Sequence, residues 1–166
     1  MLSRLLRQEA GSAAAEMALV TPLLLVLMLG SMELGYYFYS EHVVVKGVRD
    51  GARYASRQSF ADFTCPGATI GGSVVTDTQR VTRTNTVTGS GTPRLGGWTS
   101  DASVSVTITC FDNSSGTYSS FYEGVGQFPV VTVRATVPYT SLFSTIGFPS
   151  LGRNLNASSQ AVVMGI

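Results

Sequence analysis

Two glutamates flank an uncharged apolar run, and their carboxylates are the first groups in the chain whose chemistry needs an explanation. The run extends from Met17 to Met32, with Glu16 directly before it and Glu33 directly after it. A charge deep in a bilayer costs about 2.5–3.5 kcal/mol on insertion scales, and less near an interface. Glu16 is therefore expected at the mouth of a membrane. For Glu33 two interpretations stay open, which are pairing with a basic group on a partner helix and contact with the outer interface.

Cys65 and Cys110 are the two cysteines, and both follow the apolar run. One interpretation is a single disulfide formed in an oxidising compartment, and the other is a pair of buried free thiols. Export of this part of the chain would favour the disulfide. Such a bridge would close about 45 residues, and the chain-entropy estimate puts its contribution at no more than about 4 kcal/mol.

Other reactive groups are sparse. His42 is the single histidine, no serine nucleophile motif accompanies it, and no cluster has the spacing of metal ligands. No glycine-rich phosphate loop follows a strand, and the acidic residues are scattered. The net charge of +1 gives no basic footprint for nucleic acid. We therefore expect no catalytic residues, no metal, no cofactor, no small-molecule substrate and no nucleic-acid partner.

The elements that position these groups begin with a long helix. The uncharged run reaches membrane-spanning length, about 20 residues, when it is extended to Tyr39. The aromatic residues 36–39 match an interfacial belt, and membrane helices tolerate a proline such as Pro22. The length and the lack of a polar face disfavour a buried core helix, so the pattern predicts a single membrane span.

The helical period continues beyond the apolar run as two stripes. Spacings of three and four define the two faces of an amphipathic helix. Asp50 can pair with Lys46 and Arg53 along the helix, and Gly47 and Gly51 weaken it locally. One helix over residues 13–57 would be roughly 65 Å long. The apolar stripe is Val44, Val48, Ala52 and Ala55, and the polar stripe is Lys46, Arg49, Asp50, Arg53 and Arg57.

The rest of the chain predicts a small antiparallel sheet. Residues 103–110, 131–139 and 155–163 alternate between apolar and polar side chains, which is typical of half-buried strands. Pro138 indicates that the second strand ends there or is an edge. Residues 74–87 are ambiguous between a strand and a short helix.

Two stretches outside the strands carry large apolar residues. Residues 89–98 predict a loop, in which Trp98 is interpreted as a lid on the core. A second group between the last two strands is expected to pack beneath the sheet, with an interaction patch as the alternative. This group is Leu142, Phe143, Ile146, Phe148 and Leu151.

Together these elements predict an α+β fold, in which the outer half of a long N-terminal helix packs on the antiparallel sheet. The expected organisation is a leader over 1–11, a transmembrane and amphipathic helix over 12–58, and an exported β-rich domain over 59–166. The two cysteines, the Ser/Thr-rich composition and the short basic head place the C-terminal domain outside the membrane, although the basic residues after the span argue the opposite orientation.

The segment from Gly11 to Met17 places Glu16 five residues after a glycine and directly before the apolar helix. This resembles the processing site of type IV-type prepilins. Together with Ala18-Leu19, Pro22-Leu23, Glu33-Leu34-Gly35 and Gly51-Ala52-Arg53, the segment resembles the TadE-like proteins, which are minor pilins or pseudopilins of the tight-adherence (Flp) pilus system. Met17 departs from the major pilins, which have an aromatic residue there, and those pilins also lack a long C-terminal domain.

The resemblance implies that a prepilin peptidase cuts between Gly11 and Ser12. The new ammonium at Ser12 could then offset Glu16 in the same chain or in a neighbour. It also implies contacts with other pilins and the pilus assembly machinery, at the inner membrane with a periplasmic C-terminal domain or at the cell surface, and a part in surface adhesion and biofilm formation. The alternative is an unprocessed single-pass anchor that displays a periplasmic binding or sensing domain. A membrane-tethered hydrolase is disfavoured by the missing catalytic groups.

Overall fold

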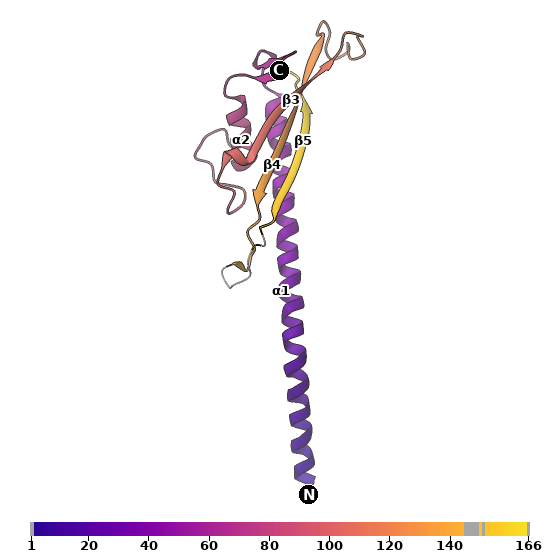
Figure 1. Ribbon diagram of the computed structural model, residues 1–166, viewed down its shortest axis with the longest axis vertical. Helices are drawn as coiled ribbons and strands as arrows, with labels where there is room; N and C mark the ends of the chain where they lie inside the picture. Colours follow the sequence, from indigo (N-terminus) through magenta and orange to yellow (C-terminus); the bar gives the residue numbers. More distant parts are fainter. Residues whose placement is uncertain (1, 145–149, 151, 166) are drawn as a thin grey trace. The chain divides into compact units, whose positions relative to one another are not determined.

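The computed structural model describes residues 2–144, 150 and 152–165, with side chains from residue 11 onward. The fold is α+β, as the sequence predicts, with one long N-terminal helix and small antiparallel sheets (Figure 1). The chain divides into two compact units, Met1–Phe38 and Tyr39–Ile166. Helix α1 (Leu2–Ser56) supplies all the described structure of the first unit and the first element of the second.

The main sheet of the second unit has three strands in the order β3-β4-β5. These are β3 (Val104–Asp112), β4 (Gln127–Pro138) and β5 (Asn154–Val162), all antiparallel to their neighbours. Their positions confirm the alternation read from the sequence, and β4 ends at Pro138 as expected. The alternation decides which face is buried, because successive side chains point to opposite sides of a strand. The inner face of β4 carries Val131, Val133, Ala135 and Val137, which are at most 2% exposed.

The ambiguous segment after the second short strand is a helix, α2 (Val74–Thr84). It buries Val74, Thr78 and Val81 on one face, whereas Thr76 on the opposite side is exposed. Asn85 ends the helix in the left-handed conformation with φ of 64°. The β-branched content had made a strand equally plausible, and the spacing of the buried positions at three and four residues decides for the helix.

Two glycines of α1 face α2. A Cβ at Gly47 would lie 2.7 Å from the carbonyl oxygen of Thr82, and one at Gly51 would collide with the Thr82 hydroxyl. The absence of side chains at these positions therefore lets the two helices approach closely. The sequence had indicated only a local weakening of the helix here. On the same side of α1, Val44, Val48, Ala52 and Ala55 are at most 1% exposed, which confirms the predicted apolar stripe.

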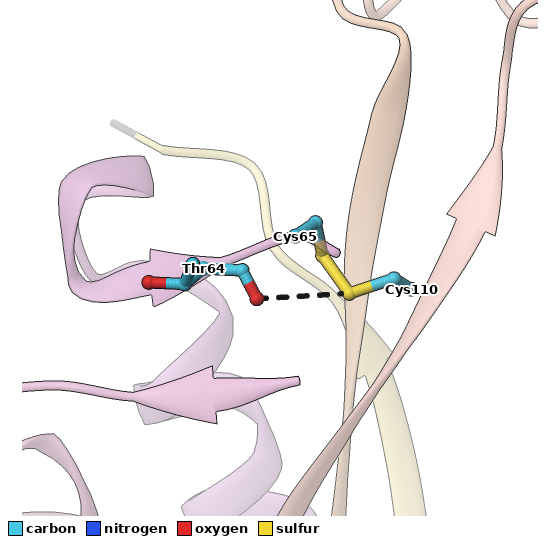
Figure 2. The surroundings of a disulfide bond; sticks show 3 residues. All are labelled: Thr64, Cys65 and Cys110. Atoms are coloured by element: carbon cyan, nitrogen blue, oxygen red, sulfur yellow. Dashed lines mark hydrogen bonds between the residues drawn. A yellow bond between two sulfur atoms is a disulfide. The ribbon is translucent and has the colours of Figure 1, made fainter. Parts of the chain in front are cut away.

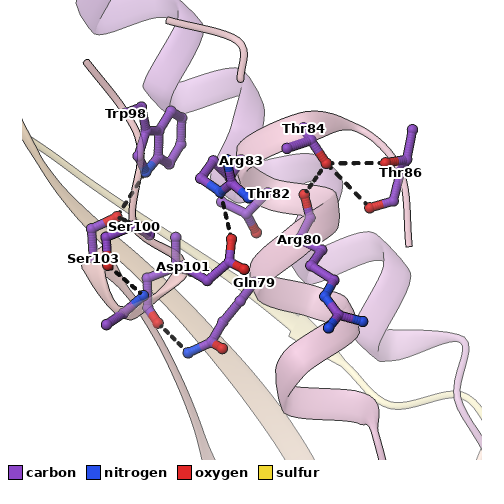
Figure 3. Close-up of polar contacts among 12 residues, drawn as sticks. Gln79, Arg80, Thr82, Arg83, Thr84, Thr86, Trp98, Ser100, Asp101 and Ser103 are labelled. Atoms are coloured by element: carbon purple, nitrogen blue, oxygen red, sulfur yellow. Dashed lines mark hydrogen bonds and ion pairs between the residues drawn. The ribbon is translucent and has the colours of Figure 1, made fainter. Parts of the chain in front are cut away.

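Polar contacts join α2 to the 3-10 turn η2 (Asp101–Ser103) and to β3 (Figure 3). Arg83 forms an ion pair with Asp101, and Gln79 Nε2 donates to the carbonyl of Val104 at 2.8 Å. Trp98 is 1% exposed, and its Nε1 donates to Oγ of Ser103 at 2.7 Å. The interpretation of Trp98 as a lid on the core is confirmed, and its only polar atom is satisfied.

The segment between α1 and α2 contains the 3-10 turn η1 (Phe60–Asp62) and a two-stranded sheet of β1 (Phe63–Thr64) and β2 (Thr69–Ile70). Cys65, directly after β1, forms a disulfide with Cys110 on β3 (Figure 2). The bridge therefore ties the chain that follows α1 to an edge strand of the main sheet.

The predicted pairing of Asp50 with Lys46 and Arg53 is wrong, because Asp50 pairs with Arg94. Its carboxylate accepts a hydrogen bond from Nη2 of Arg94 at 2.7 Å, and Arg94 also donates to Asn85. The expected partners on α1, Lys46 and Arg53, point to solvent. An arginine held in the following loop competes better than exposed neighbours on the same helix, because burial weakens solvent screening.

The apolar group between β4 and β5 is described only in part. Leu142 is 44% exposed and Phe143 is partly exposed. Ile146, Phe148 and Leu151 lie outside the described residues, so the prediction that this group packs beneath the sheet stays a prediction for them.

Candidate functional site

The first feature with functional meaning is the apolar surface of α1 within the first unit. From Gly11 to Gly30 every side chain is exposed except that of Leu29, which is partly buried. Leu19 and Val26 are 77% and 68% exposed. Burying a large apolar side chain is worth about 1.5–3 kcal/mol, so leaving a whole helix of them in water would be strongly unfavourable. This segment is long and apolar enough to cross a membrane. By length and composition it fits lipid or a set of partner helices.

The polar groups inside this segment are satisfied by the helix itself. Thr21 Oγ1 donates to the carbonyl of Met17 at 2.6 Å, and Ser31 Oγ donates to that of Met28 at 2.8 Å. Such bonds let hydroxyl groups enter an apolar phase without a partner. Pro22 lies within the helix and removes only one backbone donor. The segment is therefore compatible with the interior of a bilayer along its whole length.

Gly11, Ser12 and Glu16 all lie on α1 and are exposed. Ser12 and Glu16 are four residues apart, so they are neighbours on one face of the helix. Because Cα–Cβ bonds in a helix tilt toward its N-terminus, the Glu16 side chain leans toward the backbone of Ser12. An ammonium group at Ser12 would thus lie within reach of the carboxylate.

Gly11 packs against no other part of the described structure. A Cβ at this position would meet no atom within 4 Å. Glycine costs about 1 kcal/mol relative to alanine inside a helix. A larger residue would fit at Gly11 and would stabilise the helix. Gly11 differs in this from Gly47 and Gly51, where a Cβ would clash with Thr82.

Glu33 and the aromatic residues follow at the other end of the apolar run. Glu33, Tyr36 and Tyr37 are partly buried, whereas Phe38 and Tyr39 are 52% and 58% exposed. The rings of Tyr37 and Phe38 meet edge to face at 5.9 Å. The site therefore has a carboxylate at each end of the run, and Glu33 stands a turn before the aromatic residues. Neither interpretation of Glu33 is decided.

A groove of about 800 Å³ in the second unit was not anticipated from the sequence. Side chains of α1, of all three strands of the main sheet and of the β3–β4 connection line it. Phe128 stacks on Phe111 at 5.9 Å and on Tyr122 at 4.7 Å, and Tyr118 meets Phe128 edge to face. The only signal in the sequence was the density of aromatic residues between 111 and 128, within a segment that has no simple period.

Burial and hydrogen bonding shift three ionisable groups of the second unit. Burial raises the pKa of Tyr122, whose hydroxyl donates to the carbonyl of Val163 at 3.0 Å. Burial, and then the charge of Asp77 and a hydrogen bond to it, raise the pKa of Tyr54. Hydrogen bonds from the backbone and the hydroxyl of Ser114 lower the pKa of Asp112.

These shifts serve local structure. His42 is exposed on α1. Within the described ranges, no group of three or more His, Cys, Asp or Glu side chains could hold a metal ion.

The helix and the sheet together define an α+β protein whose N-terminal helix is long and apolar enough to cross a membrane. The family described as TadE-like protein matches residues 11–53. The match begins at Gly11 and ends at Arg53, so it contains both carboxylates of the apolar run and both glycines that face α2. The resemblance inferred from the motif is thereby confirmed over this segment. Comparison with the curated proteins and with the solved structures returned no significant match.

Proposed function

We propose that the chain is a minor pilin or pseudopilin subunit needed to assemble a tight-adherence (Flp) type IV pilus. A membrane-embedded prepilin peptidase would remove residues 1–11, and the pilus would support surface adhesion and biofilm formation. The observation that carries the proposal is the position of Glu16, five residues after Gly11 and directly before an exposed apolar helix. The TadE-like match supports it, because it begins at the glycine of this motif.

Cleavage would create an ammonium group beside an existing carboxylate. A carboxylate at the entrance to an apolar phase, such as that of Glu16, is costly unless an opposite charge lies nearby. After cleavage, the N-terminus at Ser12 lies one turn away on the same helix face. The same ammonium could instead pair with Glu16 of a neighbouring subunit, which would make helix insertion into a filament depend on processing.

The second unit belongs on the periplasmic side in this proposal. Its disulfide needs an oxidising compartment to form and persist. The four cations of the polar stripe follow the apolar run and favour the opposite orientation on a simple count. A reporter enzyme that is active only in the periplasm, fused after Ile166, tests the placement. Activity of the fusion supports it, and activity only of a cytoplasmic reporter at the same position contradicts it.

The proposal assigns no catalytic role to the chain. The groove of the second unit favours a different candidate, an unprocessed single-pass anchor that displays a periplasmic binding domain. The two candidates differ in covalent structure. A pilin subunit loses its leader, whereas an anchor keeps it.

Intact-mass measurement of the protein extracted from membranes of a strain with its prepilin peptidase separates them. We expect the mass of residues 12–166. The variant Gly11→Asp should retain the full chain, and Gln8→Asp, which adds the same charge within the leader, should be processed normally. A wild-type protein that still carries residues 1–11, or normal processing of Gly11→Asp, would contradict the pilin proposal.

A further inference from the structure

The two edges of the main sheet differ in what covers them. The edge at β3 is covered by α2, whose Gln79 bonds the Val104 carbonyl, and by the β1–β2 segment, which is tied to β3 through Cys110. At the other edge, β5 pairs with β4 alone among the strands of the described residues. Figure 1 shows α2 on the β3 side of the sheet and β5 as the strand on the opposite side. One row of backbone donors and acceptors is thus left for another strand.

The sequence of β5 carries none of the usual protection against edge pairing. Exposed edges are normally blunted by a charged side chain, a proline or a bulge. The strand reads NLNASSQAV, with no charge and no proline. Its register with β4 runs without interruption from Val130↔Val162 to Pro138↔Asn154, so it has no bulge. Short side chains at Ala157, Ser158 and Ser159 leave the backbone accessible.

The groove reaches one end of this edge. Residues 159–162 of β5 form part of its wall, with the aromatic cluster beside them. Phe121 is 82% exposed and Tyr118 is 50% exposed, and both line the groove. A strand added to β5 would direct alternate side chains toward this apolar wall, which is how strand addition combines backbone pairing with selectivity.

The charge of the groove favours one kind of occupant. Arg49 and Arg53 of α1 line it and are exposed, and no acidic side chain does so. The ion pairs within the described residues use other arginines, namely Arg80, Arg83 and Arg94. A second copy that presented the same surface would bring like charges together. The groove therefore suits a different chain that carries an acidic residue.

We propose that the free edge of β5 binds an extended segment of a partner protein, with alternating apolar side chains against the aromatic cluster and a carboxylate against Arg49 and Arg53. This goes beyond the proposed function, because the edge is present whether or not residues 1–11 are removed. A failed binding experiment would leave the processing experiment unaffected, and the reverse also holds.

The test uses the full chain in detergent micelles and three fluorescent nonapeptides. The first alternates valine and threonine and ends in two aspartates, the second ends in two lysines, and the third is the first with alternate amides N-methylated on the edge that would pair. We expect the aspartate peptide to bind at least tenfold more tightly than either of the others. In the double variant R49E/R53E the lysine peptide should become the better ligand. The control Arg57→Glu changes an exposed arginine that directly follows α1 and lies outside the groove, and should keep the wild-type preference.

Three results would overturn the proposal. Equal binding of the N-methylated peptide would show that the backbone of β5 is not used. No binding of any peptide to a folded protein would show that the edge is closed. Concentration-dependent dimerisation that R49E/R53E abolishes would show that the groove is occupied by a second copy.

Discussion

Arg94 and Asp50 lie 44 residues apart in the chain, yet Nη2 of Arg94 donates to Oδ2 of Asp50 at 2.7 Å. The arginine comes from the loop after α2 and the carboxylate from α1, and Asn85 accepts a second bond from the same Nη2. One side chain thereby links α1, the end of α2 and the loop. Both partners are largely shielded from water, with 13% and 27% of their side chains exposed.

Breaking this link should destabilise the second unit. Arg94→Met keeps the volume but leaves Asp50 and Asn85 without their donor, and we expect a loss of about 1–2 kcal/mol in the free energy of unfolding. Urea unfolding of the full chain in micelles, followed by the fluorescence of Trp98, measures it. Arg57→Met, at an exposed position directly after α1, should change the value by less than about 0.5 kcal/mol. Equal effects of the two substitutions would contradict the role of the pair.

The glycines that face α2 give a prediction with an internal control. Gly47→Ala and Gly51→Ala should each destabilise by about 1–3 kcal/mol through overpacking, although alanine is the better helix former. Thr82→Ala should rescue Gly51→Ala, because a Cβ there collides with the Thr82 hydroxyl. It should not rescue Gly47→Ala, which meets the backbone carbonyl of Thr82. Double-mutant cycles built from unfolding curves measure the two rescues. Equal rescue at both positions would contradict the contacts that the structure gives for Thr82.

Stability should fall at alkaline pH. Burial raises the pKa of Tyr122 and of Tyr54, so these phenols stay protonated in the folded state at pH values where the unfolded chain loses its protons. The stabilisation is complete below about pH 10, the unfolded value, and is lost as pH rises through the folded value. Unfolding measured from pH 8 to pH 11 should show this decline.

The variant Tyr122→Phe should remove its share of the decline. It should also cost about 0.5–1.5 kcal/mol at neutral pH, because the bond to the Val163 carbonyl is lost. A stability that does not change between pH 8 and pH 11 in the wild type would contradict the assignment.

The disulfide should be a large part of the stability of the second unit and have no part in processing. The loop between its cysteines corresponds to a sequence separation of 45, for which the chain-entropy estimate is about 4 kcal/mol as an upper figure. Cys65→Ser/Cys110→Ser should lower the free energy of unfolding by up to that amount, and reductant should have no further effect on the variant. Its leader should still be removed. Retention of residues 1–11 in a folded variant would link the bridge to processing.

The sequence predicted those features that depend on a short local period. The three strands and the apolar stripe of α1 follow from alternation and from spacings of three and four, because burial repeats with the backbone geometry. Residues 74–87 stayed ambiguous, since β-branched side chains favour strands while their spacing fits a helix. Gly47 and Gly51 were recognised as helix-weakening, and only the position of α2 explains them.

Apart from the Cys65–Cys110 disulfide, which the sequence offered as one of two interpretations, long-range pairings escaped prediction. Asp50 has basic neighbours at helical spacing, whereas its partner is in a loop that has no period. The groove depends on aromatic residues between β3 and β4 and on which sheet edge is covered, and neither follows from composition. Glu16 and Gly11 were the opposite case. Their interpretation as a processing site came from their spacing, and among the described atoms no packing contact accounts for the glycine.

The disulfide also determines how the domain responds to a protease. The loop from Thr86 to Ser90 is exposed and lies between the two bonded cysteines. A single cut there would leave both fragments covalently joined through Cys65 and Cys110, with β3 still paired to β4. The chain cut at this loop would therefore separate into two fragments on a denaturing gel only after reduction.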